Sequence, residues 1–168
     1  MNADKKILKT DFLVIGSGIA GLSFALKTAN HFKNATITII TKNEKNECNT
    51  KYAQGGIAAV WDQDDSFDKH IQDTIVAGDF ISNQKVVEMV VKEAPERLNE
   101  LISYGTDFDR QADGTFDLVK EGGHSDKRIL HYKDSTGNEI ERALLAKVKS
   151  FQSVDFFTHY FAVDLITQ

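Results

Sequence analysis

The spacing of apolar residues near the start of the chain predicts a strand, a helix and a second strand. Residues 12–15 form a short apolar run that ends at a glycine, as is typical of a buried strand in a parallel sheet. From Ile19 to Ala29, apolar residues recur every three or four positions and therefore share one face of a helix. Residues 36–41 are β-branched throughout and predict the second strand. Two strands joined by a helix in this way are expected to be parallel.

The next stretch lacks such a period. Residues 42–61 predict a long loop with room for one helical turn. A loop of this length inside a compact domain is uncommon and is often functional. Beyond it, Asp65 or Ser66 is placed to cap a helix that ends near Gly78.

A further helix is predicted between Asn83 and Gly105. Asn83 is a favourable N-cap, the valines within residues 86–91 share one side, and Gly105 ends the apolar period. Pro95 is the only proline of the chain. Because proline lacks a backbone N–H, we predict that it breaks this helix or opens a new one at its first position.

The last third of the chain mixes short elements. Asp113-Gly114 between apolar flanks predicts a β-hairpin, and residues 120–132 are rich in glycine and charge and predict a loop. A helix is predicted to start between residues 135 and 138. Strands are predicted over residues 154–157 and 161–166.

Composition narrows the class of protein. The chain has 168 residues, of which 41% are hydrophobic, and this is enough to build a core. Its net charge of −5 argues against nucleic acid as the main partner. The single cysteine, Cys48, excludes an internal disulfide and fits a reducing cytoplasm, which is the location we expect. No apolar run approaches the roughly 18 residues that span a membrane, so no membrane segment is expected.

A glycine motif follows the first predicted strand and opens the first predicted helix. It has the pattern G-x-G-x-x-G and consists of Gly16, Ser17, Gly18, Ile19, Ala20 and Gly21. Gly16 permits a tight turn, Gly18 lets the backbone approach a pyrophosphate, and Gly21 lets the helix pack closely on the strand. The free N–H groups at the start of the helix would then face the anion, with Ser17, Ile19 and Ala20 among its contacts. A glycine-rich corner without a ligand is the alternative.

One part of the usual dinucleotide motif is missing. An acidic residue normally ends the second strand and binds the ribose, whereas this strand ends in Thr41 and Lys42, and the nearest acid is Glu44. Thr41 or a backbone group would then serve the ribose. Lys42 would face a phosphate or the adenosine edge, or it is an ordinary solvated lysine. The missing acid weakens the case for a common NAD dehydrogenase.

No metal site is predicted. Asp62, Asp64 and Asp65 begin a calcium-like pattern, but the required glycine is replaced by Phe67 and the required glutamate by Asp73. The five histidines and the cysteine show no compact zinc spacing.

The most specific stretch of the chain lies in the long loop and runs Asn49, Thr50, Lys51, Tyr52, Ala53, Gln54, Gly55, Gly56, Ile57, Ala58, Ala59. Together with the glycine motif, it resembles the flavoprotein family of succinate dehydrogenases, fumarate reductases and L-aspartate oxidases. The resemblance implies an α/β fold: a Rossmann-like FAD-binding domain with a parallel sheet, further helices and a β-hairpin. It also implies that residues 49–56 bind FAD, with the paired glycines where the backbone meets the isoalloxazine ring. A flexible Gly-Gly surface loop is the alternative.

A third segment sorts the members of that family. Residues 120–125 and 128–131 resemble the L-aspartate oxidase version, whereas the succinate and fumarate enzymes typically carry an aromatic residue at position 121 and a glutamine at position 124. An amino-acid substrate has an α-ammonium group that succinate lacks, and a carboxylate near the flavin can hold it by a charge-assisted hydrogen bond. Glu121 is the candidate, and a solvated loop acid is the alternative. His124 is a candidate polar contact or acid–base group, or it orients the loop.

Asn49 bears on how the flavin is attached. Relatives with covalent flavin carry histidine at the matching place, and asparagine cannot form that bond. The resemblance therefore implies FAD bound non-covalently.

The resemblance runs from Asp11 to Ile166, and we expect the chain to correspond to the N-terminal portion of such an enzyme. Residues 1–60 would be the dinucleotide-binding βαβ unit and flavin loop, and residues 61–168 would be helical and β segments of the same domain. The rest of the FAD domain, the capping domain and the catalytic arginines would lie outside this chain. Arg128, near the Glu121 loop, is expected to serve either structure or substrate.

The resemblance implies flavin-dependent oxidation of L-aspartate to iminoaspartate. Electrons would pass to O2 or fumarate, and the product would be handed to quinolinate synthase in the first step of NAD biosynthesis. Two alternatives stay open, a succinate dehydrogenase or fumarate reductase flavoprotein and a non-catalytic FAD-binding module.

Overall fold

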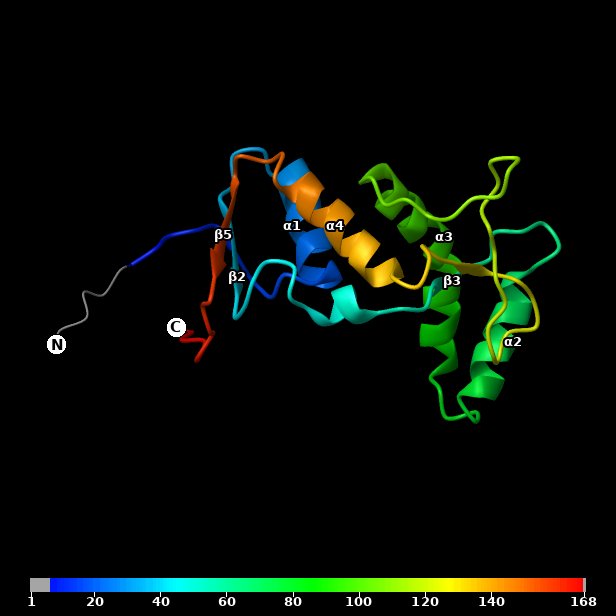
Figure 1. Ribbon diagram of the computed structural model, residues 1–168. Helices are drawn as coiled ribbons and strands as arrows, with labels where there is room; N and C mark the ends of the chain where they lie inside the picture. The colour runs from blue at the N-terminus through cyan, green and yellow to red at the C-terminus, as the bar shows by residue number, and fades with distance from the viewer. Residues whose placement is uncertain (1–6, 168) are drawn as a thin grey trace. The chain divides into compact units, whose positions relative to one another are not determined.

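The structure is a computed structural model that describes residues 7–167 in two compact units (Figure 1). The first unit contains the described residues up to Asn49 and those from Leu144 onward. The second unit contains Thr50–Ala143. The division of one FAD-binding domain into residues 1–60 and 61–168, which the resemblance implies, stays a prediction.

A three-stranded parallel sheet forms the first unit. Its strands are β1 (Phe12–Ile15), β2 (Ile37–Thr41) and β5 (Val154–Thr158), in the order β1-β2-β5. The parallel pairing of β1 with β2 and the position of β5 confirm the sequence predictions. The carboxyl ends of the three strands therefore lie at one edge, where parallel sheets commonly bind ligands.

Helix α1 (Ile19–His31) covers one face of this sheet. Its apolar stripe, Leu22, Ala25, Leu26 and Ala29, is buried as the spacing predicts. Side chains alternate across a strand, so Val14 is buried while Leu13 and Ile15 on the opposite face remain 51% and 53% exposed.

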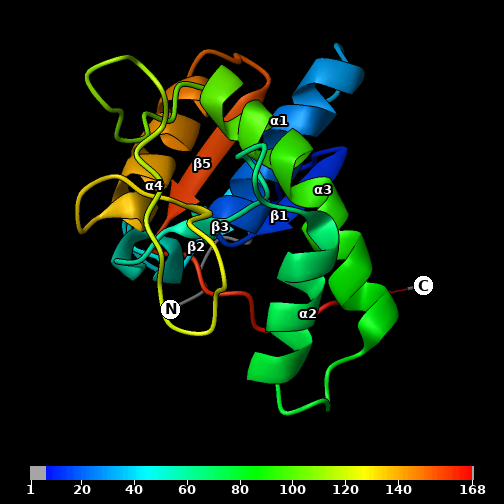
Figure 2. The same cartoon turned by 90° about the vertical axis from the view of Figure 1, so that its right-hand side faces the viewer.

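Two helices of the second unit lie side by side (Figure 2). Helix α2 (Phe67–Ala77) is capped by the Ser66 hydroxyl, which accepts a hydrogen bond from the Lys69 N–H at 3.2 Å. Helix α3 (Gln84–Ser103) is capped by Asn83. Both caps and the end of α2 at Gly78 confirm the sequence predictions.

The predicted break at Pro95 is wrong. Pro95 lies inside α3, which continues without interruption from Gln84 to Ser103. Proline in a helix interior costs about 3 kcal/mol, because it removes one hydrogen bond and crowds the preceding turn. Val91 on one side of the proline and Leu98 and Leu101 on the other are all buried. Their burial on one continuous helix face offsets that cost.

The remaining elements are short. The predicted long loop contains a 3-10 turn, η1 (Asn49–Tyr52), and the strand β3 (Ile57–Ala58), which pairs antiparallel with β4 (Ile129–Leu130). Helix α4 (Thr136–Val148) starts where expected. The predicted hairpin turn is present, with Gly114 at φ +88°, but its arms pair only at the Arg110–Phe116 bridge.

The predicted strand over residues 161–166 is wrong. These residues have no regular structure, and Phe161, Val163 and Ile166 are 75%, 88% and 94% exposed. A strand needs a neighbouring strand for its backbone and a core for its apolar face, and the described residues offer this segment neither.

No helix among residues 7–167 is long and apolar enough to cross a membrane.

Candidate functional site

In the first unit, the glycine motif forms the turn between β1 and α1. The Gly16 N–H donates to the Ile40 carbonyl at 2.9 Å, and Gly16 has φ +105°, a conformation that L side chains rarely adopt. A Cβ atom at Gly21 would collide with the Gly16 carbonyl oxygen. These two glycines therefore have the roles that the sequence predicts, a tight turn and close packing of helix on strand.

The start of α1 is open to an anion. Gly18 is its N-cap, no side chain caps the helix, and no acidic residue stands in the first turn, which begins with Ile19 and Ala20. The first N–H groups of a helix lack partners within the helix and carry a partial positive charge. The geometry and charge of this turn therefore suit a phosphate group.

Ser17 and Thr41 lie deeper than expected. Both side chains are buried, and the Ser17 hydroxyl donates to the Thr41 hydroxyl at 3.2 Å. This hydrogen bond joins the turn to the end of β2. It leaves the backbone of Ser17, rather than its hydroxyl, as the group that suits a phosphate.

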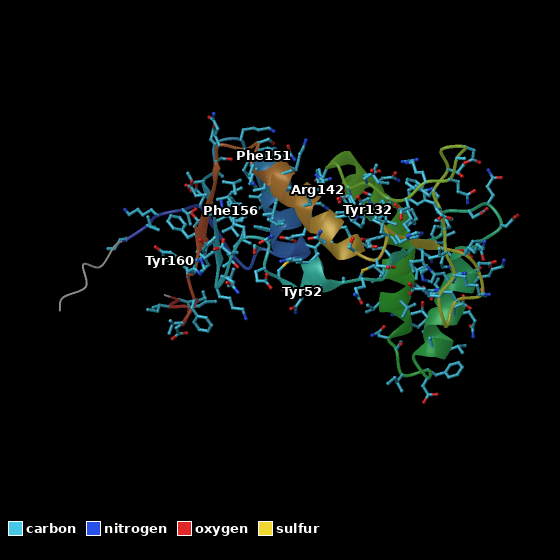
Figure 3. All side chains as sticks on the ribbon, viewed as in Figure 1. Tyr52, Tyr132, Arg142, Phe151, Phe156 and Tyr160 are labelled. Carbon is cyan, nitrogen blue, oxygen red and sulfur yellow. The ribbon has the colours of Figure 1, made fainter. Side chains whose placement is uncertain are left out.

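Charged residues follow the carboxyl end of β2, where the motif usually has an acid. Lys42 is exposed, and the next acid, Glu44, contacts the His159 Nε2 at 3.1 Å. The ammonium group of Lys45 lies 4.7 Å from the ring centre of Phe156, which is labelled on β5 in Figure 3. Segments that follow β2 and β5 thus contact each other at this edge.

In the second unit, the loop that contains Gly55 and Gly56 runs into β3. A Cβ atom at Gly56 would collide with the Leu130 carbonyl oxygen and the Ile129 side chain of β4. A Cβ atom at Gly137 would collide with the Thr50 carbonyl oxygen, and the Gly137 N–H donates to the Ala53 carbonyl at 2.9 Å. The predicted flavin loop is therefore fixed by close backbone packing. Its residues Tyr52, Ala53, Gln54 and Gly55 are exposed, while Thr50 and Lys51 are half-buried.

A pocket of about 540 Å³ joins this loop to Glu121. Its lining consists of Gln54, Gly55, Gly56, Val119, Glu121, His131, Lys133 and Asp134. A Cβ atom at Gly55 would lie 3.5 Å from the Glu121 Oε1. The structure thus brings together the two segments that the sequence singled out separately.

Four residues of the pocket are not among the site residues that the sequence predicts, namely Val119, His131, Lys133 and Asp134. Lys133 has φ +47°, and its N–H donates to Asp109 Oδ2 at 2.6 Å. The same carboxylate oxygen lies 3.3 Å from the His131 Nδ1. Tyr132, which lies between His131 and Lys133 in the sequence, is labelled in Figure 3. The pairing of β3 with β4 brings this turn to the loop, and no local pattern predicts it.

His124 is absent from the lining of this pocket. Its Nδ1 lies 3.4 Å from a guanidinium nitrogen of Arg128, and its ring lies 5.5 Å from the ring of His70. Arg128 is fully buried and donates to both carboxylate oxygens of Asp65, at 2.7 and 2.8 Å, and to Asp73 at 2.7 Å. These contacts favour the structural role among the two that the sequence left open for Arg128, and they support a loop-orienting role for His124.

The family described as FAD binding domain matches residues 11–168. The chain belongs to this family.

Curated relatives and solved structures agree with that assignment. The chain is 51% identical to L-aspartate oxidase 2-a, chloroplastic, of Nicotiana tabacum, and this match covers 94% of the chain. It is 40% identical to the L-aspartate oxidase of Vibrio cholerae, and this match covers 100% of the chain. It covers 24% and 32% of those two proteins, so it spans about a quarter to a third of their length. A solved quinol-fumarate reductase with menaquinol matches 98% of the chain and 28% of that protein, with a TM-score of 0.87 and 30% identity.

The residues of this FAD-binding domain fit the dinucleotide that the family name implies. Gly18 has φ −75° and ψ −178°, which any residue adopts, so the backbone conformation does not require glycine there. A ligand that approaches the backbone closely would require it. Backbone N–H groups at the start of α1 would supply donors for that ligand.

The buried histidine of the second unit makes stability depend on pH. Burial and the neighbouring Arg128 and His124 lower the pKa of His70, while Asp65 and Asp73 oppose this shift. Its Nδ1 is buried and has no hydrogen-bond partner among the described residues. Because the folded pKa lies below the ordinary 6.5, the unfolded chain binds the proton first, and stability falls as the pH drops below about 6.5.

We expect the free energy of unfolding to fall by up to about 1.4 kcal/mol per pH unit in this window. Urea unfolding between pH 7 and pH 5 measures it. The control is His70→Gln, which keeps a polar side chain but cannot titrate. An identical slope in the variant would assign the effect to other groups.

Proposed function

We propose that this protein is an L-aspartate oxidase that binds FAD non-covalently. The observation that carries the proposal is the Glu121 carboxylate on the wall of the pocket formed with Gly55 and Gly56. The identity to proteins named L-aspartate oxidase supports it.

Two sets of residues are proposed to bind FAD, and each is described within its own unit. In the first unit, the turn from Gly16 to Ala20 would hold the pyrophosphate, with Lys42 near the adenosine half. In the second unit, residues 50–56 would contact the flavin, and the absence of side chains at Gly55 and Gly56 would admit the ring. Asn49, the last residue of the first unit, cannot form a covalent flavin bond.

When bound, FAD would supply a two-electron acceptor. The Cα of L-aspartate would lose a hydride and its ammonium group would lose a proton to solvent, which gives iminoaspartate, and the electrons would go on to O2 or fumarate. Glu121 would accept hydrogen bonds from the α-ammonium group and so orient the substrate. We further propose that iminoaspartate is handed to quinolinate synthase, as the first step of NAD biosynthesis. The purified protein, extended to the length of its curated relatives, should be yellow, acid precipitation should release the colour, and L-aspartate should bleach it without oxygen. A colourless protein, or colour that no amount of L-aspartate bleaches, would refute the proposal.

A fumarate reductase is the second candidate, because the fold matches the quinol-fumarate reductase with a TM-score of 0.87. Glu121 separates the two, since fumarate and succinate bring no ammonium group for a carboxylate to bind. An assay with both L-aspartate and succinate as electron donors decides between them.

Substitution of Glu121 by glutamine is expected to impair L-aspartate oxidation far more than fumarate reduction. A hydrogen bond to a charged group contributes roughly 1.5–3 kcal/mol, so kcat/KM for L-aspartate should fall by about 10- to 100-fold. Fumarate reduction should change by less than about threefold, because this substrate makes no such bond. The assay uses the protein extended to the length of its curated relatives.

The matched control is Glu93→Gln, which removes one exposed carboxylate from α3. It should leave both activities unchanged. Equal losses on both substrates in Glu121→Gln would show that Glu121 acts on the fold or the flavin.

A further inference from the structure

The loop that carries Glu121 is closed at its base by backbone hydrogen bonds. The Arg128 N–H donates to the Val119 carbonyl at 3.2 Å, and the Val119 N–H donates to the Ile129 carbonyl at 3.1 Å. Between these points, residues 120–127 contain no helix or strand. The position of Glu121 therefore depends on contacts that the loop makes with its surroundings.

Helix α2 supplies those contacts. Asp73 Oδ2 accepts three hydrogen bonds, from the Ser125 N–H at 2.7 Å, the Ser125 hydroxyl at 2.8 Å and an Arg128 N–H at 2.7 Å. A Cβ atom at Gly123 would lie 3.5 Å from the Ala77 Cβ, so the loop lies directly against the last turn of α2.

The other ion pair between α2 and the loop is weaker. Lys69 Nζ contacts Asp126 Oδ2 at 3.0 Å, but the two side chains are 49% and 34% exposed. Such pairs contribute about 0–1 kcal/mol. Asp73 is only 17% exposed, and hydrogen bonds to a charged acceptor are stronger at low exposure.

The charge of Asp73 is maintained by the loop itself. Burial alone would raise the pKa of this carboxyl, but the hydrogen bonds from Ser125 and Arg128 outweigh burial and lower it. Asp73 therefore stays ionised and keeps its hydrogen bonds to Ser125 across the neutral range. The turn between Glu121 and Ser125 is short, since the His124 N–H donates back to the Glu121 carbonyl at 3.3 Å.

We propose that Asp73 is a positioning residue, which holds Ser125 against α2 and thereby keeps Glu121 on the wall of the pocket with Gly55. This positioning role deepens the proposed function and rests on it. Asp73 can affect substrate choice only if Glu121 binds the α-ammonium group of the substrate. Asp73 is not among the residues that line the pocket, so its proposed effect on Glu121 runs through the loop.

The first test compares two variants that disturb the same guanidinium. Asp73→Asn removes the charge that binds both Ser125 and Arg128. Asp65→Asn removes the charge of the carboxylate that accepts two hydrogen bonds from Arg128 and one from the Ser66 N–H. Amide hydrogen exchange of residues 121–125 and the melting temperature are measured for each.

Asp73→Asn should speed exchange of residues 121–125 by about tenfold or more, as expected for loss of a charged hydrogen-bond acceptor. Asp65→Asn should lower the melting temperature at least as much, yet change exchange in this loop by less than about threefold. Equal acceleration in both variants would overturn the proposal, because loop order would then follow global stability. Ser125→Ala, an exposed substitution that keeps the Asp73–Arg128 pair, should give an intermediate acceleration. Unchanged exchange in Ser125→Ala and Asp73→Asn would also overturn it.

The second test is catalytic and uses the protein at the length of its relatives. Asp73→Asn should raise KM for L-aspartate by about tenfold and leave KM for fumarate within about twofold, with unchanged flavin content. Equal effects on both substrates would contradict a role through Glu121. A wild-type protein that does not oxidise L-aspartate would refute the proposed function, while the exchange result would still decide whether Asp73 orders the loop.

Discussion

Replacing Gly18 with valine is expected to abolish FAD binding while leaving the fold intact. The side chain would fill the space that a pyrophosphate needs beside the first N–H groups of α1. The backbone at Gly18, with φ −75° and ψ −178°, accepts a substituted residue without strain. The free energy of unfolding should therefore fall by only about 1 kcal/mol, the usual difference between glycine and an apolar residue at an N-cap. Flavin absorbance of the purified protein and urea unfolding measure the two effects.

The neighbouring glycines provide the matched controls. Gly21→Ala should damage the fold itself, because its Cβ would collide with the Gly16 carbonyl. Gly16→Ala should cost roughly 1–2 kcal/mol of stability through its positive φ, since nothing within 4 Å obstructs its Cβ. Undiminished FAD affinity in Gly18→Val would show that the turn does not hold the pyrophosphate.

The sequence predicts β1, α1 and β2 well because their signals are local. A glycine motif, an apolar stripe and a β-branched run each specify one element, and parallel pairing of β1 with β2 follows from the helical crossover that joins them. The same reasoning misjudged Pro95, because local propensity carries no information about the buried contacts of Leu98 and Val91 that keep α3 continuous. At residues 161–166 the sequence predicts an element that the structure lacks. An apolar pattern forms a strand only where a neighbouring strand can pair with it.

The candidate site divides in the same way. Motifs and family resemblance predict Gly55, Gly56 and Glu121 as site residues, and all three line the same pocket. His131 and Asp134 reach the pocket through the pairing of β3 with β4, whose strands are separated by some 70 residues. Such distant pairings depend on tertiary structure, so no spacing along the chain reveals them.

Loss of the Arg128 side chain is the change expected to destabilise the second unit most. Arg128 is fully buried, and the Asp65 side chain that it binds is 1% exposed. Arg128→Met would keep much of the volume but leave a buried carboxylate without a counter-ion, which costs about 3–5 kcal/mol. Urea unfolding measures this loss. Arg110→Met is the control, because Arg110 is exposed, lies 4.1 Å from the Phe116 ring centre and should contribute less than about 1 kcal/mol.

A double-mutant cycle separates the unpaired charge from the lost packing. If the unpaired carboxylate causes most of the loss, Asp65→Asn should cost far less in the Arg128→Met background than in the wild type. The coupling energy should exceed about 1 kcal/mol, as for residues in direct contact within a buried network. Additive effects would instead assign the loss to packing around Arg128. In that case, burial of the aliphatic part of the Arg128 side chain would stabilise the second unit more than the hydrogen bonds from Arg128 to Asp65 do.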